Sequence, residues 1–364
     1  MAMAASEPGI MGLEDFTAAL DWQARHAEEN GAPATARVIR ALAGVRASDT
    51  ATGRRIAGWQ GLTLKDAMPL RIAGGFHHLL LTGADDRLAA VYSGAVTDQA
   101  EVDALVIDLA HRFDARLLPW LDGPPQTNEA GRSASIMAGL LWLAQRVRAP
   151  RFDLFELGAS AGVNTMIERY FFRLGSIEVG PEASMMRIVP QWRGPPPPAP
   201  PPGFAITAVK GCDLAPIDLA DPEAALRLKA YVWPDAAERM ARIDAAIALA
   251  GQQPPDLVAA DAGDFAAAML ARAAEPGMAR VMFHSIMWQY LPAATQGRIT
   301  AAVLAAAATA TPETPLGWIA LETEPATFRH DLRVRLWDGA GHQGEEHLLS
   351  HAHPHGAWVE WLGA

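Results

Sequence analysis

One short segment, residues 152–164, constrains the fold more strongly than any other part of the chain. Residues 152–157 carry the pattern of a buried β-strand, and a turn of small residues follows them before a predicted helix. Small residues let a backbone approach a ligand closely, and the free N–H groups at the start of a helix point toward that ligand. We therefore predict a strand, a ligand-binding loop and a helix.

Two chemistries fit this loop. Glu156, Gly158 and Gly162 form Glu-x-Gly-x-x-x-Gly, which resembles the first motif of S-adenosylmethionine-dependent methyltransferases, with Ser160 in place of the usual middle glycine. Gly158, Ser160 and Gly162 also form Gly-x-Ser-x-Gly, the nucleophile elbow of α/β-hydrolases, with Ser160 at its apex. The strands elsewhere in the chain distinguish these alternatives.

Residues 1–148 have a mainly helical pattern and are predicted to form an N-terminal cap or substrate domain. Apolar residues recur there every three or four positions, and Thr127 and Asn128 are typical capping residues before the last repeat, which ends near Val147. Earlier helices are predicted at residues 16–28, 34–45 and 101–118.

Residues 149–364 are predicted to form a Rossmann-like α/β domain of the class I methyltransferase type. Short apolar runs alternate with helical spans, as in a parallel sheet with crossover helices, and antiparallel strands follow at the end. The strands are predicted at residues 152–157, 206–210, 257–260, 280–283 and 316–321, then at 332–337, 345–350 and 357–362, with helices at 235–250 and 296–310. A hydrolase of the elbow type needs several strands before its serine, and the first 150 residues do not provide them.

Residues 194–203 contain seven prolines, so this segment is expected to be extended and neither helical nor part of a central strand. We interpret it as a stiff surface spacer within an insertion after the first crossover helix. The alternative is a ligand for a proline-recognition domain.

Three acidic residues follow predicted strand ends, where open α/β sheets bind ligands. Glu156 would hold the ammonium group of S-adenosylmethionine, Asp213 its ribose and Asp261 its adenine. The alternative roles are structural: Glu156 would cap the turn that follows it, and Asp213 would be an N-cap ahead of the turn at Pro216. Asp261 fits the adenine role better than Asp264, which would simply cap the next helix. The loop residues that would hold the amino-acid end of the cofactor are Gly158, Ser160, Gly162 and Asn164.

The fourth predicted strand leads into polar and aromatic residues that form the expected reacting edge. Histidine is the side chain that ordinarily exchanges a proton near neutral pH, so His284 would accept a proton from an attacking hydroxyl or amine, with Tyr290 as a second catalytic candidate. Trp288 would provide an aromatic wall for the substrate or the sulfonium. Asn128 and Arg132, one helical turn apart, would orient a polar substrate. Packing in the core is the alternative for the first three, and an interdomain contact for the last two.

His351, His353 and His355 alternate with a period of two, which would place them on one face of a strand. Pro354 interrupts that strand, and the spacing specifies no acidic or cysteine partner. We therefore expect a hydrogen-bonded turn and no metal.

Net charge and cysteine content limit the partners. The net charge of −11 and a pI near 5.5 disfavour nucleic acid, which is bound mainly by clustered Lys and Arg. The single cysteine, Cys212, fits a reducing compartment, and no apolar run approaches the roughly 20 residues that cross a bilayer. We expect a cytoplasmic protein that binds a small molecule and neither nucleic acid nor membrane.

Several segments together resemble one known family. They are Thr127-Asn128-Glu129 with Gly131-Arg132, Glu156 to Asn164, Gly211 to Asp218, Trp233-Pro234-Asp235 and His284-Ser285. The chain is similar through them to the bacterial domain of unknown function 2332 family, from about Leu13 to the end. This resemblance implies a methyltransferase-like fold and no particular reaction.

The favoured interpretation is an S-adenosylmethionine-dependent methyltransferase that acts on a small molecule. Methyl transfer depends mainly on aligning nucleophile, methyl group and sulfur, so a strong base is optional. The alternatives are a serine hydrolase using Ser160 and a non-catalytic ligand-binding protein that retains the fold.

Overall fold

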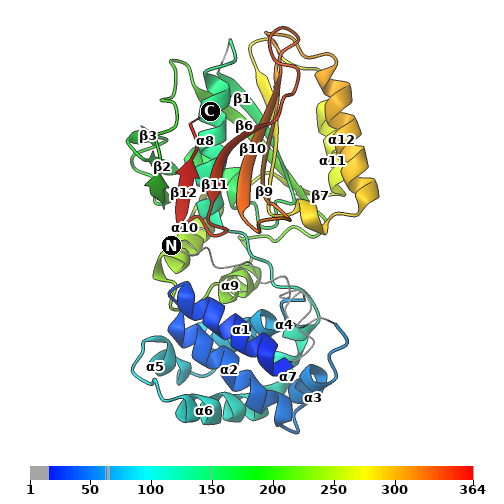
Figure 1. The fold of residues 1–364 in the computed structure, drawn as a ribbon. Coiled ribbons are helices and arrows are strands. Elements are labelled where there is room, and N and C mark those ends of the chain that lie inside the picture. Colours follow the sequence, from blue (N-terminus) through cyan, green and yellow to red (C-terminus); the bar gives the residue numbers. More distant parts are fainter. Residues whose placement is uncertain (1–15, 62, 64–65, 149, 364) are drawn as a thin grey trace. The chain divides into compact units, whose positions relative to one another are not determined.

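The computed structural model describes residues 16–61, 63, 66–148 and 150–363 as a mixed α/β protein (Figure 1). These residues fall into two compact units. One unit comprises the chain through Thr127 together with Asp221–Asp244, and the other comprises Asn128–Ala220 and the chain from Ala245 onward. The division therefore lies before the last helix of the predicted N-terminal domain rather than near residue 148, and the helical unit takes in a second, distant segment.

The described part of the first unit contains helices and turns but no strand (Figure 1). Its elements are α1 (Phe16–Glu29), α2 (Pro33–Ala47), α3 (Ala51–Ala57), α4 (Met68–Leu81), α5 (Leu88–Tyr92), α6 (Gln99–Arg112), α7 (Asp114–Leu117), η2 (Leu118–Leu121), α9 (Pro222–Ala230) and the start of α10 (Ala237–Gln252). Thr50, Asp98 and Asp221 cap α3, α6 and α9 through their side-chain oxygens. None of the helices in the described ranges is long and apolar enough to span a membrane.

Asp235 joins the second segment of the helical unit to its first. Its Oδ2 accepts the backbone N–H of Ala34 at 2.7 Å, and its Oδ1 accepts the Thr35 hydroxyl at 2.6 Å. Both donors lie in the first turn of α2, where helix N–H groups have no partner within the helix. The Trp233-Pro234-Asp235 motif thus has a structural role, because Asp235 caps a helix about 200 residues earlier in the sequence.

The second unit is built on a sheet of nine strands in the order β5-β12-β11-β10-β9-β8-β1-β6-β7. Their bounds are β1 (Arg151–Leu157), β5 (Gln191–Arg193), β6 (Ala205–Asp213), β7 (Leu257–Ala259), β8 (Ala279–Ser285), β9 (Leu316–Thr323), β10 (His330–Trp337), β11 (His347–Ala352) and β12 (Trp358–Trp361). Strands β7, β6, β1, β8 and β9 are parallel, whereas β10, β11 and β12 continue the sheet as an antiparallel meander. The predicted parallel sheet with antiparallel C-terminal strands is confirmed.

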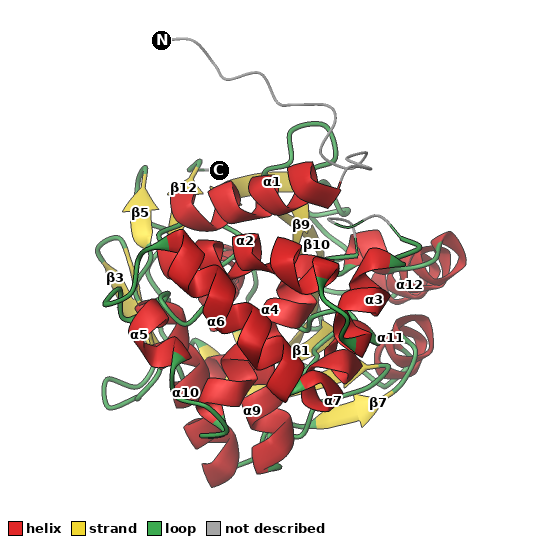
Figure 2. Ribbon diagram, turned by 90° about the horizontal axis from the view of Figure 1, so that it is seen from below, coloured by secondary structure: helices red, strands yellow, loops and turns green. Residues whose placement is uncertain are grey.

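Helices cover both faces of this sheet (Figure 1). On one face α11 (Ala262–Leu270) and α12 (Ala293–Ala307) lie side by side (Figures 1 and 2). Phe265 and Ile299 pack with Phe155 of β1. On the other face α8 (Ser133–Ala144) crosses β9 and β10, where Gly139 allows close approach of Ile319 and Val334. Every residue of α8 is buried, which explains why its sequence is apolar all round.

The segment after β1 corrects one prediction. The expected helix is only a 3-10 helix, η4 (Asn164–Arg169), and a small sheet of β2 (Phe171–Leu174), β3 (Ile177–Val179) and β4 (Arg187–Ile188) follows it. Strand β5 then extends the main sheet by pairing with β12. Residues 194–203 contain neither helix nor strand, as their prolines predict.

Candidate functional site

The order of the parallel strands reverses at β1, whose neighbours are β6 on one side and β8 on the other. Open α/β sheets bind ligands outside the carboxyl ends of the strands at such a switch point. A cavity of about 300 Å³ lies there, which we call the edge cavity. It is lined by Gly158, Cys212, Asp213, Leu214, Ala260, Asp261, Ala262, Met287, Tyr290, Leu291, Pro292 and Thr295.

The small-residue loop has a left-handed backbone at three alternate positions. Gly158, Ser160 and Gly162 have φ values of +66°, +53° and +72°. The N–H of Ala159 donates to the Cys212 carbonyl at 2.8 Å, and that of Ser160 donates to Asp213 Oδ2 at 2.9 Å. These two N–H groups of the loop are therefore bonded within the protein.

Asp213 and Asp261 both line the edge cavity, and both also accept hydrogen bonds from backbone N–H groups. Asp213 accepts the Ser160 N–H through Oδ2 and the Ala215 N–H at 3.0 Å through Oδ1. Asp261 is the N-cap of α11, where its Oδ1 accepts the Gly263 N–H at 2.8 Å and a bond of 2.7 Å from Arg298. The sequence interpretation gave the capping role to Asp264, and this is a correction: Asp264 lies inside the first turn, bonded to Arg298.

Glu156 is buried and belongs to the opposite face of the sheet from the cavity. Its neighbours in β1, Phe155 and Leu157, face α11 and α12, so alternation directs Glu156 toward the α8 side. Burial raises its pKa well above the ordinary value, and the nearby Asn164 amide and Arg132 only partly oppose this shift. Glu156 Oε2 has no hydrogen-bond partner among the described residues, and neither does Ser160 Oγ, which is also shielded from solvent.

His284 has both ring nitrogens engaged. The Trp318 indole N–H donates to Nε2 at 3.0 Å, so Nε2 accepts, and Nδ1 donates to Glu322 Oε1 at 2.6 Å. The side chain is 2% exposed, and it lines a second cavity over the sheet face rather than the edge cavity. This geometry fixes the imidazole in place and leaves neither nitrogen open to a substrate.

The two aromatic residues of the predicted reacting edge line different cavities. Tyr290 lines the edge cavity and is 74% exposed. Trp288, two residues earlier in η5 (Trp288–Tyr290), lines the second cavity and stacks on His284 at 5.1 Å between ring centroids. The short helix η5 thus contributes to both cavities.

Asn128 and Arg132 bond to loops of the sheet unit. Asn128 Oδ1 accepts the Val163 N–H at 2.8 Å, next to η4, and Arg132 Nε donates to the Pro354 carbonyl at 2.9 Å. Neither residue lines the edge cavity. Their contacts position the loop after β1 and the turn before β12.

The three alternating histidines do not share one strand. His351 lies in β11 and pairs through Nδ1 with Asp331 Oδ1 at 2.7 Å, whereas His353 and His355 lie in the turn that follows. Among the described residues, no group of three or more His, Cys, Asp or Glu side chains has a metal-binding arrangement.

The sequence interpretation missed Met287 and Glu322. Met287 covers Gly158 closely enough that a Cβ there would lie 3.0 Å from the methionine methyl carbon. Glu322 accepts bonds from His284, the Met287 N–H at 3.2 Å and the Trp288 N–H at 3.3 Å. An acid at the end of the fifth predicted strand is the signal that identifies Glu322, by the same rule that selected Asp213 and Asp261.

The fold and the cavity at its switch point define a mixed α/β protein with a candidate ligand site. The chain belongs to the family described as uncharacterized protein conserved in bacteria, domain of unknown function 2332, whose model matches residues 17–361. No curated protein and no solved structure matches the chain.

Proposed function

We propose that the edge cavity binds S-adenosylmethionine and that the protein transfers the methyl group to a small molecule. The single observation that carries the proposal is the cavity at the switch point, which brings Gly158, Asp213 and Asp261 together from the ends of three strands. Its volume of about 300 Å³ lies at the lower end of the range for ligand pockets, roughly 300–1,000 Å³.

The residues that line the edge cavity suggest how each would contact the cofactor. Asp213 would accept the ribose hydroxyls and Asp261 the adenine amino group, since a carboxyl group has about four acceptor sites and each aspartate uses only some of them within the protein. Tyr290, which is exposed at the cavity, is the candidate group beside the reacting atoms. His284 would act through Trp288, which it holds by stacking, and is a positioning residue in this proposal.

Calorimetry with S-adenosylhomocysteine tests the cofactor. We expect binding that weakens at least about tenfold in Asp261→Asn, because asparagine keeps the helix cap but loses the charge that favours the adenine amino group. Asp256→Asn is the matched control, since Asp256 pairs with Lys210 on the surface and does not line the edge cavity. Absence of binding at millimolar ligand by a folded protein, or binding of NAD instead, would refute the proposal.

One observation favours a serine hydrolase as the second candidate. Ser160 has a left-handed backbone and an unbonded Oγ, as a nucleophile at a strained turn would. Its Oγ is buried, however, and the segment that follows is a 3-10 helix rather than the α-helix of an elbow. A protein that binds S-adenosylhomocysteine without turnover is the third candidate, and a methyl-transfer assay distinguishes it from an enzyme.

The proposed partner is a small molecule and neither nucleic acid nor membrane, and the proposed location is the cytoplasm. The net charge of −11 supports the first part. The single cysteine, which is buried as a free thiol, supports the second.

A further inference from the structure

The second cavity lies over the sheet face next to α12 and measures about 310 Å³. We call it the face cavity. Its lining comes from β8, η5, α12, β9, β10 and the segment before β11, and it shares no lining residue with the edge cavity. Most of its lining residues are strand side chains, whose places are set by the pairing of β9 with β8 and β10.

Two indole rings form a corner of the face cavity. The rings of Trp288 and Trp318 are 5.7 Å apart between centroids and are inclined by 58°. His284 fixes both, because it stacks on Trp288 and accepts the indole N–H of Trp318. A rigid corner of this kind suits a flat aromatic ring, which can stack on one indole and meet the other with its edge.

The acidic groups of the face cavity are bonded within the protein. Glu322 accepts from the His284 ring and from the N–H groups of Met287 and Trp288. Glu346 accepts from Arg333 Nη1 at 2.9 Å and from Arg335 Nη2 at 2.8 Å. One carboxylate is thus shared between two guanidinium groups.

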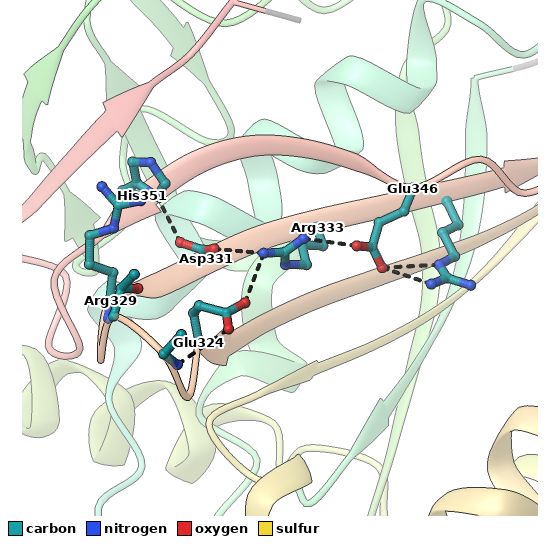
Figure 3. A network of polar contacts seen from close by, with 9 residues as sticks. Glu324, Arg329, Asp331, Arg333, Glu346 and His351 are labelled. Carbon is teal, nitrogen blue, oxygen red and sulfur yellow. Dashed lines mark hydrogen bonds and ion pairs between the residues drawn. The ribbon is translucent and has the colours of Figure 1, made fainter.

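The two arginines differ in the number of carboxyl groups that they contact. Arg333 is surrounded by carboxyl groups (Figure 3), because its Nη2 also donates to Glu324 at 3.0 Å and to Asp331 at 2.9 Å. Among the described residues Arg335 has a single carboxylate partner, Glu346, which it contacts through Nε and Nη2. A guanidinium has five N–H donors, so Arg335 keeps the donors of Nη1 for another acceptor. The Arg335 side chain is 40% exposed, and its guanidinium carbon lies 5.8 Å from the centroid of the Trp318 ring.

We propose that the face cavity binds a planar aromatic molecule that carries a carboxylate group. The ring lies in the corner of Trp288 and Trp318, and the carboxylate is bound by Arg335, beside Glu346. Arg335 selects an anion because it lines the cavity and the donors of its Nη1 have no acceptor among the described residues. This inference is independent of the proposed cofactor.

Calorimetry with three probes tests the class of ligand, in the absence of S-adenosylmethionine. 2-Naphthoate has both required features, 2-naphthamide lacks the charge, and decahydro-2-naphthoate lacks the flat ring. We expect 2-naphthoate to bind, the amide to bind at least about tenfold more weakly, and the saturated acid several-fold more weakly, because a hydrogen bond between charged groups and an aromatic stack each contribute on this scale.

Variants locate the site. Arg335→Gln is expected to remove the preference for naphthoate over naphthamide while leaving the affinity for the amide nearly unchanged. Arg173→Gln is the matched control, because Arg173 also lies on a strand and pairs with a single exposed glutamate, Glu178, but does not line the face cavity. Glu346→Gln removes the competing carboxylate and should bind naphthoate more tightly, by roughly threefold or more. A damaged fold cannot produce that gain.

Four results would overturn the proposal. They are no binding of 2-naphthoate at millimolar concentration, equal affinity for the acid and the amide in the wild-type protein, weaker binding in Glu346→Gln, and an equal loss of affinity in Arg335→Gln and Arg173→Gln. Binding of S-adenosylhomocysteine is measured separately, so failure here and failure of the cofactor proposal are distinguishable.

Discussion

The edge cavity and the face cavity are of similar volume but are built in different ways. The edge cavity is assembled from loops after strand ends, and its carboxyl groups bond mainly to backbone N–H groups. The face cavity is assembled from strand side chains, which bond mainly to one another. Side-chain substitutions should therefore disturb the face cavity most, and backbone geometry should control the edge cavity.

Removal of Glu322 is the strongest test of this difference. We expect Glu322→Ala to lower the free energy of unfolding by about 3 kcal/mol, because it leaves the buried Nδ1–H of the neutral His284 ring without an acceptor, and each buried donor left unsatisfied costs about 1–3 kcal/mol. The substitution would also leave the N–H groups of Met287 and Trp288 without their carboxylate acceptor. Urea unfolding measures the effect. Glu178→Ala, which breaks an exposed pair on β3, is the control and should change stability by less than about 1 kcal/mol. Equal losses would contradict the comparison.

A methyl group at Gly158 tests the backbone side of the comparison. We expect Gly158→Ala to destabilise the protein by about 2 kcal/mol, since a left-handed backbone strains alanine and the new Cβ would lie 3.0 Å from the Met287 methyl carbon. Gly83 has the same φ of +66° with nothing within 4 Å, so Gly83→Ala reports the strain alone. Thermal unfolding of both variants separates the two contributions. A larger loss in Gly83→Ala would show that Met287 does not restrict the loop.

The buried carboxyl group behind the loop gives a dependence on pH. Burial raises the folded-state pKa of Glu156 well above its ordinary value of 4.5, so above that pH the unfolded chain releases a proton that the folded protein keeps. The stability from this group is present below pH 4.5 and is lost as the pH rises. In Glu156→Gln the side-chain amide does not titrate, so the variant lacks this dependence on pH. Its stability relative to wild type should rise by about 1.4 kcal/mol per pH unit from about pH 5 until the folded-state pKa is reached.

Urea unfolding of both proteins at each pH from 5 to 8 measures this difference. Other titrating groups are common to the two proteins and cancel. A difference that stays flat or falls with pH would show that the carboxyl group ionises in the folded state as readily as in the unfolded chain.

Sequence alone predicted the edge cavity better than the face cavity, for a physical reason. Asp213 and Asp261 each follow a strand directly, and parallel strands bring their carboxyl ends to one edge, so local patterns placed both beside Gly158. The face cavity depends on register: His284 meets Glu322 and Arg335 meets Glu346 only once β8, β9, β10 and the segment before β11 are paired. No local pattern specifies those partners.

The same distinction explains one error in the fold and one feature that the sequence did not predict. The glycine loop resembled the start of a helix, but the chain turns after η4 into a small sheet, and nothing within the loop signals that insertion. The return of the chain to the helical unit at Asp221–Asp244 was not predicted, because Asp235 caps α2 through a contact across about 200 residues. Strand positions and the antiparallel end were predictable because alternation and turn residues are local.

The smallest expected effect concerns Ser160. Its Oγ has no hydrogen-bond partner in the described part of the chain and is shielded from solvent, so Ser160→Ala removes an unsatisfied polar atom and keeps the left-handed backbone. Stability should change by less than about 0.5 kcal/mol, because the loop is held through its N–H bond to Asp213, which alanine retains. S-adenosylhomocysteine affinity should also stay within about threefold, which is under 1 kcal/mol. A fluorophosphonate probe provides the decisive measurement, since a hydrolase would be labelled in the wild type and not in Ser160→Ala. Labelling of that kind would identify Ser160 as a nucleophile, and it would favour the hydrolase over the methyltransferase.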